Sequence, residues 1–141
     1  LVNVSSLAAD YPLPCQPAYN AAKAGLANFS RTLMLEYADE PLTIIDFQPG
    51  DYNTGFNDAT PRPPDSQMPA HIARAWRALD SHLRAAPKPQ KAAQDLKKAL
   101  LRNRSGTVTS GDFFQAGLGK IGAHLMPQRL LLWFLRRYYN L

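Results

Sequence analysis

A phenol and an ammonium group stand four residues apart near the start of the chain, at Tyr19 and Lys23. The interval Asn20-Ala21-Ala22 is rich in alanine and favours a helix, and residues four apart on a helix lie on the same face. An ammonium within a few ångström of a phenol stabilises the phenolate, which suits a side chain that takes up and releases protons. We therefore predict that Tyr19 is a general acid or base.

A serine hydroxyl precedes this pair. Residues 1–5 have the pattern of the end of a strand, and Ser6 follows where the strand opens into a loop. There the hydroxyl could hold a substrate oxygen beside Tyr19. The loop continues to Gln16 and contains apolar side chains that could line a substrate pocket, namely Leu7, Tyr11 and Leu13.

The chain around these residues predicts a parallel strand-helix-strand unit. Pro17 suits the first turn of a helix that should run to about Ala38. Residues 42–47 then have the β-branched character of a strand. Two apolar strands joined by a helix of this length pair in parallel, and ligands bind beyond their carboxyl ends. Ser6 and the turn Pro49-Gly50 both fall there.

Four elements in this order resemble the short-chain dehydrogenase/reductase family. They are Asn3-Val4-Ser5-Ser6 after a strand, a step of thirteen residues to a tyrosine, Tyr-x-x-x-Lys opening a helix, and a Pro-Gly-x-x-x-Thr turn at residues 49–54. The resemblance covers roughly residues 1–60. It implies an α/β fold, the C-terminal part of a doubly wound, Rossmann-like parallel sheet with added C-terminal helices.

The resemblance also implies an activity and roles for the site residues. The activity is hydride transfer between NAD or NADP and a carbonyl or alcohol substrate. Ser6 would orient the substrate oxygen with Leu7 and Leu13 beside it, Tyr19 would pass the proton, and Lys23 would hold the nicotinamide ribose. The turn that would contact the nicotinamide comprises Pro49, Gly50, Tyr52 and Thr54.

The chain looks like the C-terminal half of one such domain. It starts at Leu1 inside an apparent strand, and no Gly-x-Gly-x-x-Gly turn joins a strand to a helix. We expect the nucleotide-binding half before residue 1, and we expect residues 1–141 alone to be inactive. Residues 1–60 would form the catalytic unit, 51–69 the substrate loop and 69–141 a helical C-terminal region.

Two readings of function follow. The first is the oxidoreductase, and the alternative is a non-catalytic fragment or scaffold of the same fold that acts as a binding module. A serine hydrolase is a distant third, because Ser6 is not in Gly-x-Ser-x-Gly. We expect no metal site.

The basic charge is concentrated in the second part of the chain. The 141 residues carry a net charge of +5, but residues 1–60 hold two basic and seven acidic side chains while 61–141 hold fourteen and four. No nucleic-acid-binding motif accompanies this charge, so nucleic acid is not an expected partner. The single Cys15 cannot form an internal disulfide, which fits the cytoplasm, and we read it as a small loop residue.

The remaining segments predict helices and contacts with partners. Residues 69–86 and 89–103 read as basic amphipathic helices, 107–109 as a short strand, and 111–125 and 128–139 as helices. The helix after Pro17 is apolar on two sides, which favours a homodimer or homotetramer. The last helix has leucines and aromatic residues between arginines, so it suits a membrane interface, a cap on the substrate pocket or a subunit contact.

Overall fold

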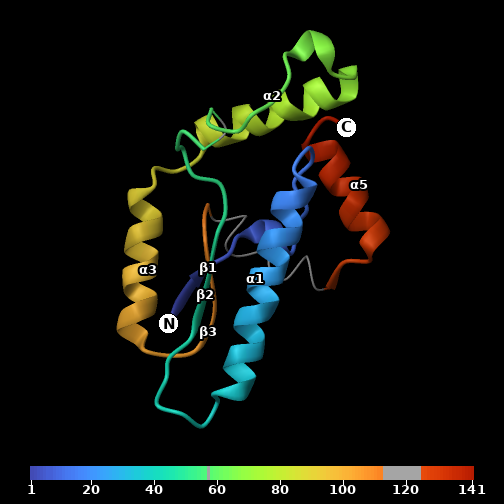
Figure 1. The fold of residues 1–141 in the computed structure, drawn as a ribbon. Helices are drawn as coiled ribbons and strands as arrows, with labels where there is room; N and C mark the ends of the chain where they lie inside the picture. Colours follow the sequence, from blue (N-terminus) through green and yellow to red (C-terminus); the bar gives the residue numbers. More distant parts are fainter. Residues whose placement is uncertain (57, 113–124) are drawn as a thin grey trace.

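The fold is built around three parallel strands. In the computed structural model, which describes residues 1–56, 58–112 and 125–141, these are β1 (Val2–Val4), β2 (Ile45–Pro49) and β3 (Gly106–Ser110). They lie side by side in the order β1-β2-β3, with β2 in the centre (Figure 1). The chain therefore has the predicted α/β, Rossmann-like arrangement.

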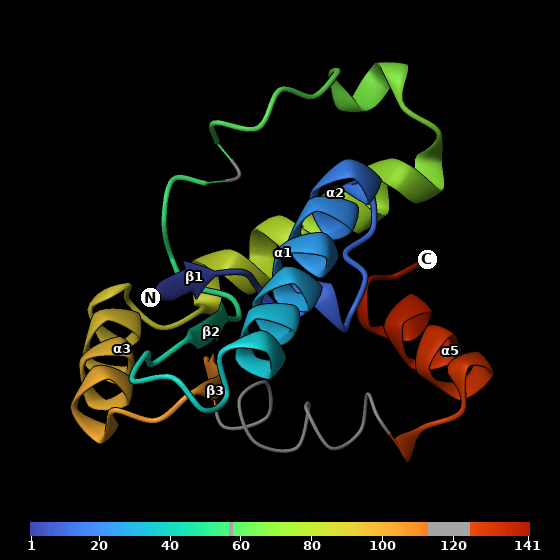
Figure 2. The same cartoon turned by 60° about the horizontal axis from the view of Figure 1, so that its bottom comes forward.

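Helices cover both faces of this sheet. Helix α1 (Pro17–Glu36) begins at the proline and makes the parallel crossover from β1 to β2, so it contacts both strands. Helix α3 (Gln90–Arg102) contacts β2 and β3 on the opposite face. Figures 1 and 2 both show the strands between these two helices. Residues 42–44, predicted as strand, precede the first paired residue of β2.

The face of the sheet under α3 is apolar. Ile45 and Phe47 of β2 are buried against Ala99 of α3. The partly buried residues packed around them are Val2, Ala92, Leu96 and Val108. The apolar stripe of the second basic helix therefore faces the sheet, although Leu100, predicted in that stripe, is half exposed.

The face under α1 is polar, because alternate residues of β2 point the other way. Asp46 and Gln48 are both fully buried there. Asp46 accepts a hydrogen bond from the Ser5 hydroxyl and another, 2.8 Å long, from Gln48 Nε2. Asn3 donates to Ser30 of α1 at 3.0 Å. These bonds replace water for groups that would otherwise be costly to bury.

A second apolar cluster joins α2 (Ala70–Ala85) and α5 (Gln128–Tyr138). Trp76 and Leu79 of α2 are buried against Leu135 and Tyr139. Partly buried residues from the loop after β1, from the residues before α2 and from the two helices themselves complete it, namely Tyr11, Leu13, Cys15, Met68, Ile72 and Leu131. Burial in this region raises the pKa of the Cys15 thiol, so its position fits the predicted loop residue.

The other segments differ from the predictions in detail. The long loop over 51–69 contains one short 3-10 helix, Asp65–Gln67. Gly111 and Asp112 form a bend, and the rest of the helix predicted over 111–125, with the glycine run 117–122, lies almost wholly outside the described residues. Within the parts that the structure describes, no helix is long and apolar enough to cross a membrane.

Candidate active site

Lys23 connects α1 to the carboxyl end of β1. Its Nζ donates a 2.9 Å hydrogen bond to the carbonyl oxygen of Val4 and lies 5.7 Å from the centre of the Tyr19 ring. The two side chains are thus neighbours on one face of α1, as their spacing predicts. The ammonium contacts the face of the ring, which is a cation–π arrangement, and α1 holds it at the end of the strand that leads to Ser6.

Ser6 lies between the ends of two strands. It caps a short 3-10 helix, Leu7–Ala9, by accepting a 3.1 Å hydrogen bond from the Ala8 N–H. Its hydroxyl donates at 3.4 Å to the carbonyl of Pro49, the last residue of β2. Ser6 is 8% exposed. The structure therefore brings Ser6 to the Pro49-Gly50 turn at the carboxyl edge of the sheet.

Asn20 positions the loop that carries the proposed pocket residues. Its Oδ1 accepts a 3.1 Å bond from the Leu13 N–H, and its Nδ2 donates at 2.8 Å to the Leu13 carbonyl. An ion pair of 3.5 Å between Asp10 and Arg31 holds the same loop to α1. Sequence reasoning overlooked Asn20. The available signal was an amide residue in the first turn of a helix, where asparagine commonly bonds nearby backbone.

Asn20→Ala should loosen this loop. Both Leu13 backbone groups lose their partner, and each net hydrogen bond is worth about 0.5–1.5 kcal/mol. If the loop borders the substrate, the Michaelis constant should rise about tenfold while the turnover number changes less. Steady-state kinetics would measure both, with the whole protein that contains this chain, called the natural protein below. Asn28→Ala, an exposed asparagine on the same helix, is the control. An unchanged Michaelis constant with a lower melting temperature would leave Asn20 a purely structural role.

Thr54 makes a local turn bond. Its Oγ1 accepts a 3.4 Å hydrogen bond from the Phe56 N–H, and its side chain is exposed. Phe56 in turn places its ring 5.6 Å from that of Tyr19, tilted by 57°. The turn after β2 thus reaches the predicted acid/base residue through Phe56. Contact of Thr54 with a nicotinamide stays a prediction.

Tyr52 is buried and anchors the turn to β3 and α3. Its hydroxyl is hydrogen-bonded to the Ser110 hydroxyl, which donates at 2.8 Å to Asp95 Oδ2. Lys91 donates to the same carboxylate at 2.7 Å. Burial tends to raise the pKa of Asp95, but the hydrogen bonds from Lys91 and Ser110 outweigh it and hold the pKa below its usual range.

Backbone hydrogen bonds also hold the turn after β2 in place. Gly50 donates from its N–H to the Ser110 carbonyl at 2.7 Å, and Asn53 donates to the Pro87 carbonyl at 2.9 Å. The residues that hold the turn come from β3 and from the junction of α2 and α3. The Pro-Gly turn is therefore held firmly beside Ser6. Its predicted contact with a cofactor, like that of Tyr52, remains a prediction.

Comparison with known proteins finds a match in the first part of the chain. Residues 1–64 match the family model described as short chain dehydrogenase. Residues 1–64 are therefore similar to short-chain dehydrogenases. The match includes β1, α1 and β2, with Ser6, Tyr19, Lys23 and the turn after β2, whereas α2, α3, β3 and α5 lie beyond it.

Two curated members are similar to the same region. A 3-ketodihydrosphingosine reductase of Bacteroides thetaiotaomicron is 36% identical over 58 residues, which are 41% of this chain and 22% of that protein. A 3beta-hydroxysteroid dehydrogenase 1 of Eggerthella lenta is 39% identical over 57 residues, 40% of this chain and 22% of that protein. The matched stretch thus spans about a fifth of the length of these curated short-chain dehydrogenases.

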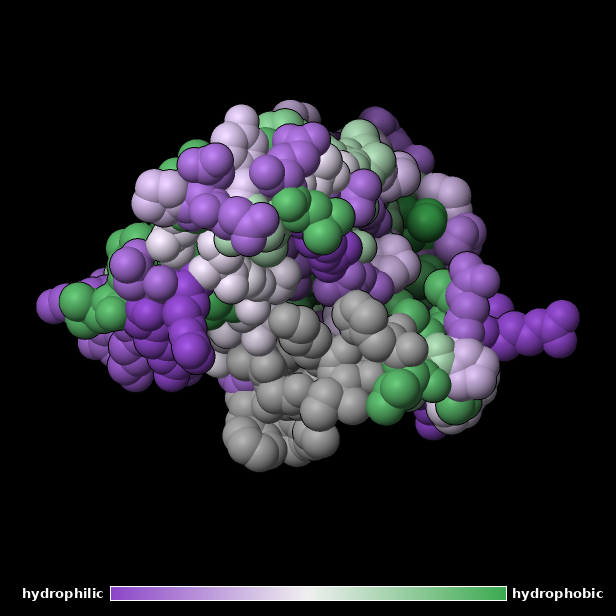
Figure 3. Space-filling view, turned by 90° about the horizontal axis from the view of Figure 1, so that it is seen from below, coloured by the Kyte–Doolittle hydropathy of each residue, from purple (hydrophilic) through white to green (hydrophobic). Residues whose placement is uncertain are grey.

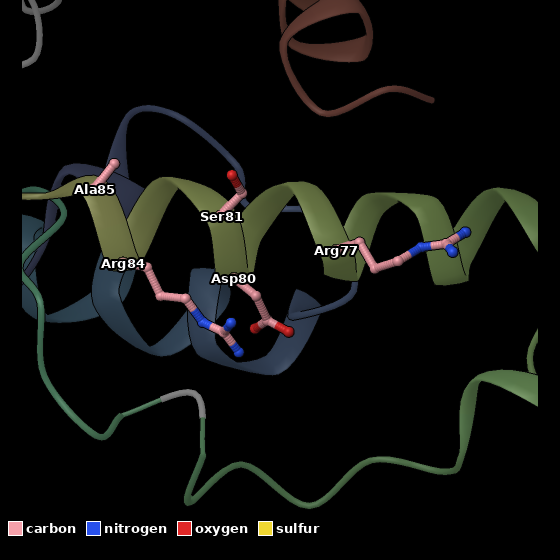
Figure 4. Close-up of a pocket in the computed structure, with 5 residues that line it drawn as sticks. All are labelled: Arg77, Asp80, Ser81, Arg84 and Ala85. Atoms are coloured by element: carbon pink, nitrogen blue, oxygen red, sulfur yellow. The ribbon is translucent and has the colours of Figure 1, made fainter.

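Two hollows on the described surface of the chain lie along α2. One of about 470 Å³ is lined by Arg77, Asp80, Ser81, Arg84 and Ala85, all on that helix (Figure 4). A second of similar volume is lined by Arg74, Arg77, Ala78, Ser81, His82 and Asn140. Neither contains Ser6, Tyr19 or Lys23. Leu7 is buried under the loop, and Leu13 packs into the cluster between α2 and α5.

Across residues 1–56, 58–112 and 125–141, no three histidine, cysteine, aspartate or glutamate side chains form a group able to hold an ion.

Proposed function

We propose that the natural protein is a nicotinamide-dependent oxidoreductase that interconverts a carbonyl and an alcohol, with Tyr19 as general acid and base. The observation that carries the proposal is the placement of Tyr19 and Lys23 as neighbours on α1, with Lys23 bonded to the end of β1 at 2.9 Å. Parallel sheets bind dinucleotides beyond this edge. The match of residues 1–64 to the short chain dehydrogenase model supports the same reaction class.

The site residues suit a bound NAD or NADP. Lys23 uses one of its three N–H donors on the Val4 carbonyl, so two are left for ribose hydroxyls. The rigid turn at Pro49 and Gly50 presents backbone groups at the same sheet edge. When bound there, the nicotinamide would supply or accept the hydride.

The chain's own groups would handle the oxygen and its proton. In the reductive direction, Tyr19 donates its phenolic proton to the substrate oxygen while carbon receives the hydride. In the oxidative direction, the phenolate takes the hydroxyl proton as carbon loses the hydride. The Lys23 ammonium stabilises the negative charge on Tyr19 between these steps, and Ser6 turns its hydroxyl from Pro49 to the substrate oxygen.

The relatives guide the choice of substrates. Their names describe a keto compound that is reduced and a hydroxysteroid that is oxidised, the two states that this mechanism interconverts. Leu7 and Leu13 are taken up by packing within the fold, so the choice of substrates rests on these names. We propose ketones and secondary alcohols on large apolar molecules as the substrate class.

The test is an assay of the natural protein with NAD, NADP and their reduced forms. A panel of apolar ketones and alcohols should cause a substrate-dependent change in nicotinamide absorbance. Calorimetry on the same sample measures cofactor binding independently. Cofactor binding without turnover of any panel member would support the non-catalytic alternative, and failure to bind either cofactor would contradict the proposal outright.

We also propose that the natural protein is a homodimer or homotetramer that pairs through α1. Phe29 is 55% exposed and Leu35 81% exposed on the side of this helix away from the sheet. Large apolar groups on a helix that already covers a sheet favour a second partner. Leu35→Glu should lower the mass found by sedimentation. An unchanged mass would exclude α1 as the contact.

A further inference from the structure

Helix α5 is apolar on two faces. The inward face, with Leu131, Leu135 and Tyr139, packs on α2 beside Trp76 and Leu79. The ring of His82 of α2 also contacts that of Tyr138, with ring centres 4.2 Å apart and a tilt of 32°. These contacts bury the inward side of the helix. They do not account for the apolar residues on its outward side.

The outward face presents large apolar groups to water. Leu130, Trp133 and Phe134 are 49%, 62% and 50% exposed. Leu130 and Trp133 are three residues apart and Phe134 follows, so the three adjoin along one side of the helix. Single exposed apolar residues are common, but an adjoining group that includes tryptophan marks a contact surface. Figure 3 shows hydrophobic surface beside hydrophilic surface on the side where α5 lies.

The charged side chains of α5 itself are all basic. Arg129, Arg136 and Arg137 of α5 are all exposed, and no acidic residue follows Asp112 in the sequence. Helix α5 thus interleaves arginine with its outward apolar residues. A protein partner that buried this face would have to pair these guanidinium groups one by one, whereas a layer of anionic headgroups neutralises them in any register.

A second basic group lies at the end of α5. Arg74 of α2 donates from Nε to the Asn140 carbonyl at 3.4 Å, and it lines a hollow of about 470 Å³ with Arg77. Within the described part of the chain, the ion pairs of arginine are those of Arg31 and Arg62. The arginines of α5 and this pair therefore have no carboxylate partner there.

We propose that the outward face of α5 binds an anionic phospholipid surface. Trp133, Phe134 and Leu130 enter the boundary between headgroups and acyl chains, and Arg129, Arg136 and Arg137 bind lipid phosphates. A tryptophan and a phenylalanine flanked by arginines are the composition of helices that lie in a membrane interface. The inward face stays packed on α2 and on the loop after β1. The helix can therefore contact the membrane without leaving the fold.

The test uses the natural protein and vesicles of phosphatidylcholine with and without phosphatidylserine. Protein should sediment with the phosphatidylserine vesicles at low salt and be released as salt screens the charges. Trp133→Ser should lower the partition coefficient about tenfold or more, as should Arg136→Gln with Arg137→Gln. All three residues are exposed, so circular dichroism should show an unchanged fold.

The matched control is Arg102→Gln with Arg104→Gln. Both residues are exposed and removing them changes the net charge equally, but they lie at the end of α3, across the molecule from α5 (Figures 1 and 2). This pair should retain most of the binding. If the Arg102/Arg104 variant lost as much vesicle binding as the Arg136/Arg137 variant, binding would depend on net charge alone. That result would overturn the proposal. So would absence of vesicle binding, or a fall in oligomer mass on Trp133→Ser, which would make this face a contact between copies.

Discussion

Tyr19→Phe is expected to lower the turnover number of the natural protein by about 10²- to 10⁴-fold, the usual contribution of a positioned acid or base. The substitution removes only the hydroxyl, so the ring keeps its contacts with Lys23 and Phe56. Binding of the nicotinamide cofactor, measured by calorimetry, should change little. The loss therefore belongs to proton transfer and not to the shape of the site.

Tyr37→Phe is the matched control. Tyr37 follows the last turn of the same helix and is 43% exposed, far along α1 from Lys23. It should retain turnover within about twofold, since surface substitutions away from special features have small effects. If the Tyr19 variant keeps full turnover as well, the acid/base role of Tyr19 is wrong, although the chain could still bind the cofactor.

Lys23→Met is expected to weaken both cofactor binding and turnover, each by about 10- to 100-fold. Methionine keeps the length of the side chain but loses the ammonium that bonds Val4 and lies over the Tyr19 ring. Hydrogen bonds to charged groups contribute about 1.5–3 kcal/mol, which corresponds to this range. Calorimetry gives the cofactor affinity and initial rates give the turnover.

Lys97→Met removes an equal charge from an exposed position on α3 and should be neutral. A Lys23 variant that binds cofactor normally and turns over normally would contradict the role of the ammonium. If Tyr19 and Lys23 act as one unit, the double variant should be little worse than Tyr19→Phe alone, because interacting residues are not additive. If the loss of turnover in the double variant equalled the sum of the two single losses in free energy, Tyr19 and Lys23 would act independently.

The strand-helix-strand unit was predictable from the sequence because its signals are local. Proline at the start of α1, alanine through its first turns and a β-branched run after it specify elements without reference to distant residues. The four-residue step from Tyr19 to Lys23 places both on one face of any helix. The α3 stripe was equally readable, since Ala92, Leu96 and Ala99 recur at helical spacing.

The polar side of the sheet was decided only by the tertiary structure. The segment 42–47 reads as an apolar strand, but Asp46 points under α1 and is satisfied by Ser5, forty-one residues away in the chain, and by Gln48. No local pattern tells which donor will meet a buried carboxylate. The same holds for Tyr52, whose hydroxyl meets Ser110 only because β3 pairs beside β2.

For α5, too, the sequence determined the helix and the tertiary structure decided which of its faces is buried. The sequence determined a short helix with leucines and aromatic residues between arginines, because composition and spacing are properties of the segment itself. It could not choose which apolar residues would be covered. Packing on α2 selected Leu131, Leu135 and Tyr139 and left Trp133 in solvent, since burial depends on a partner surface more than fifty residues away in the chain.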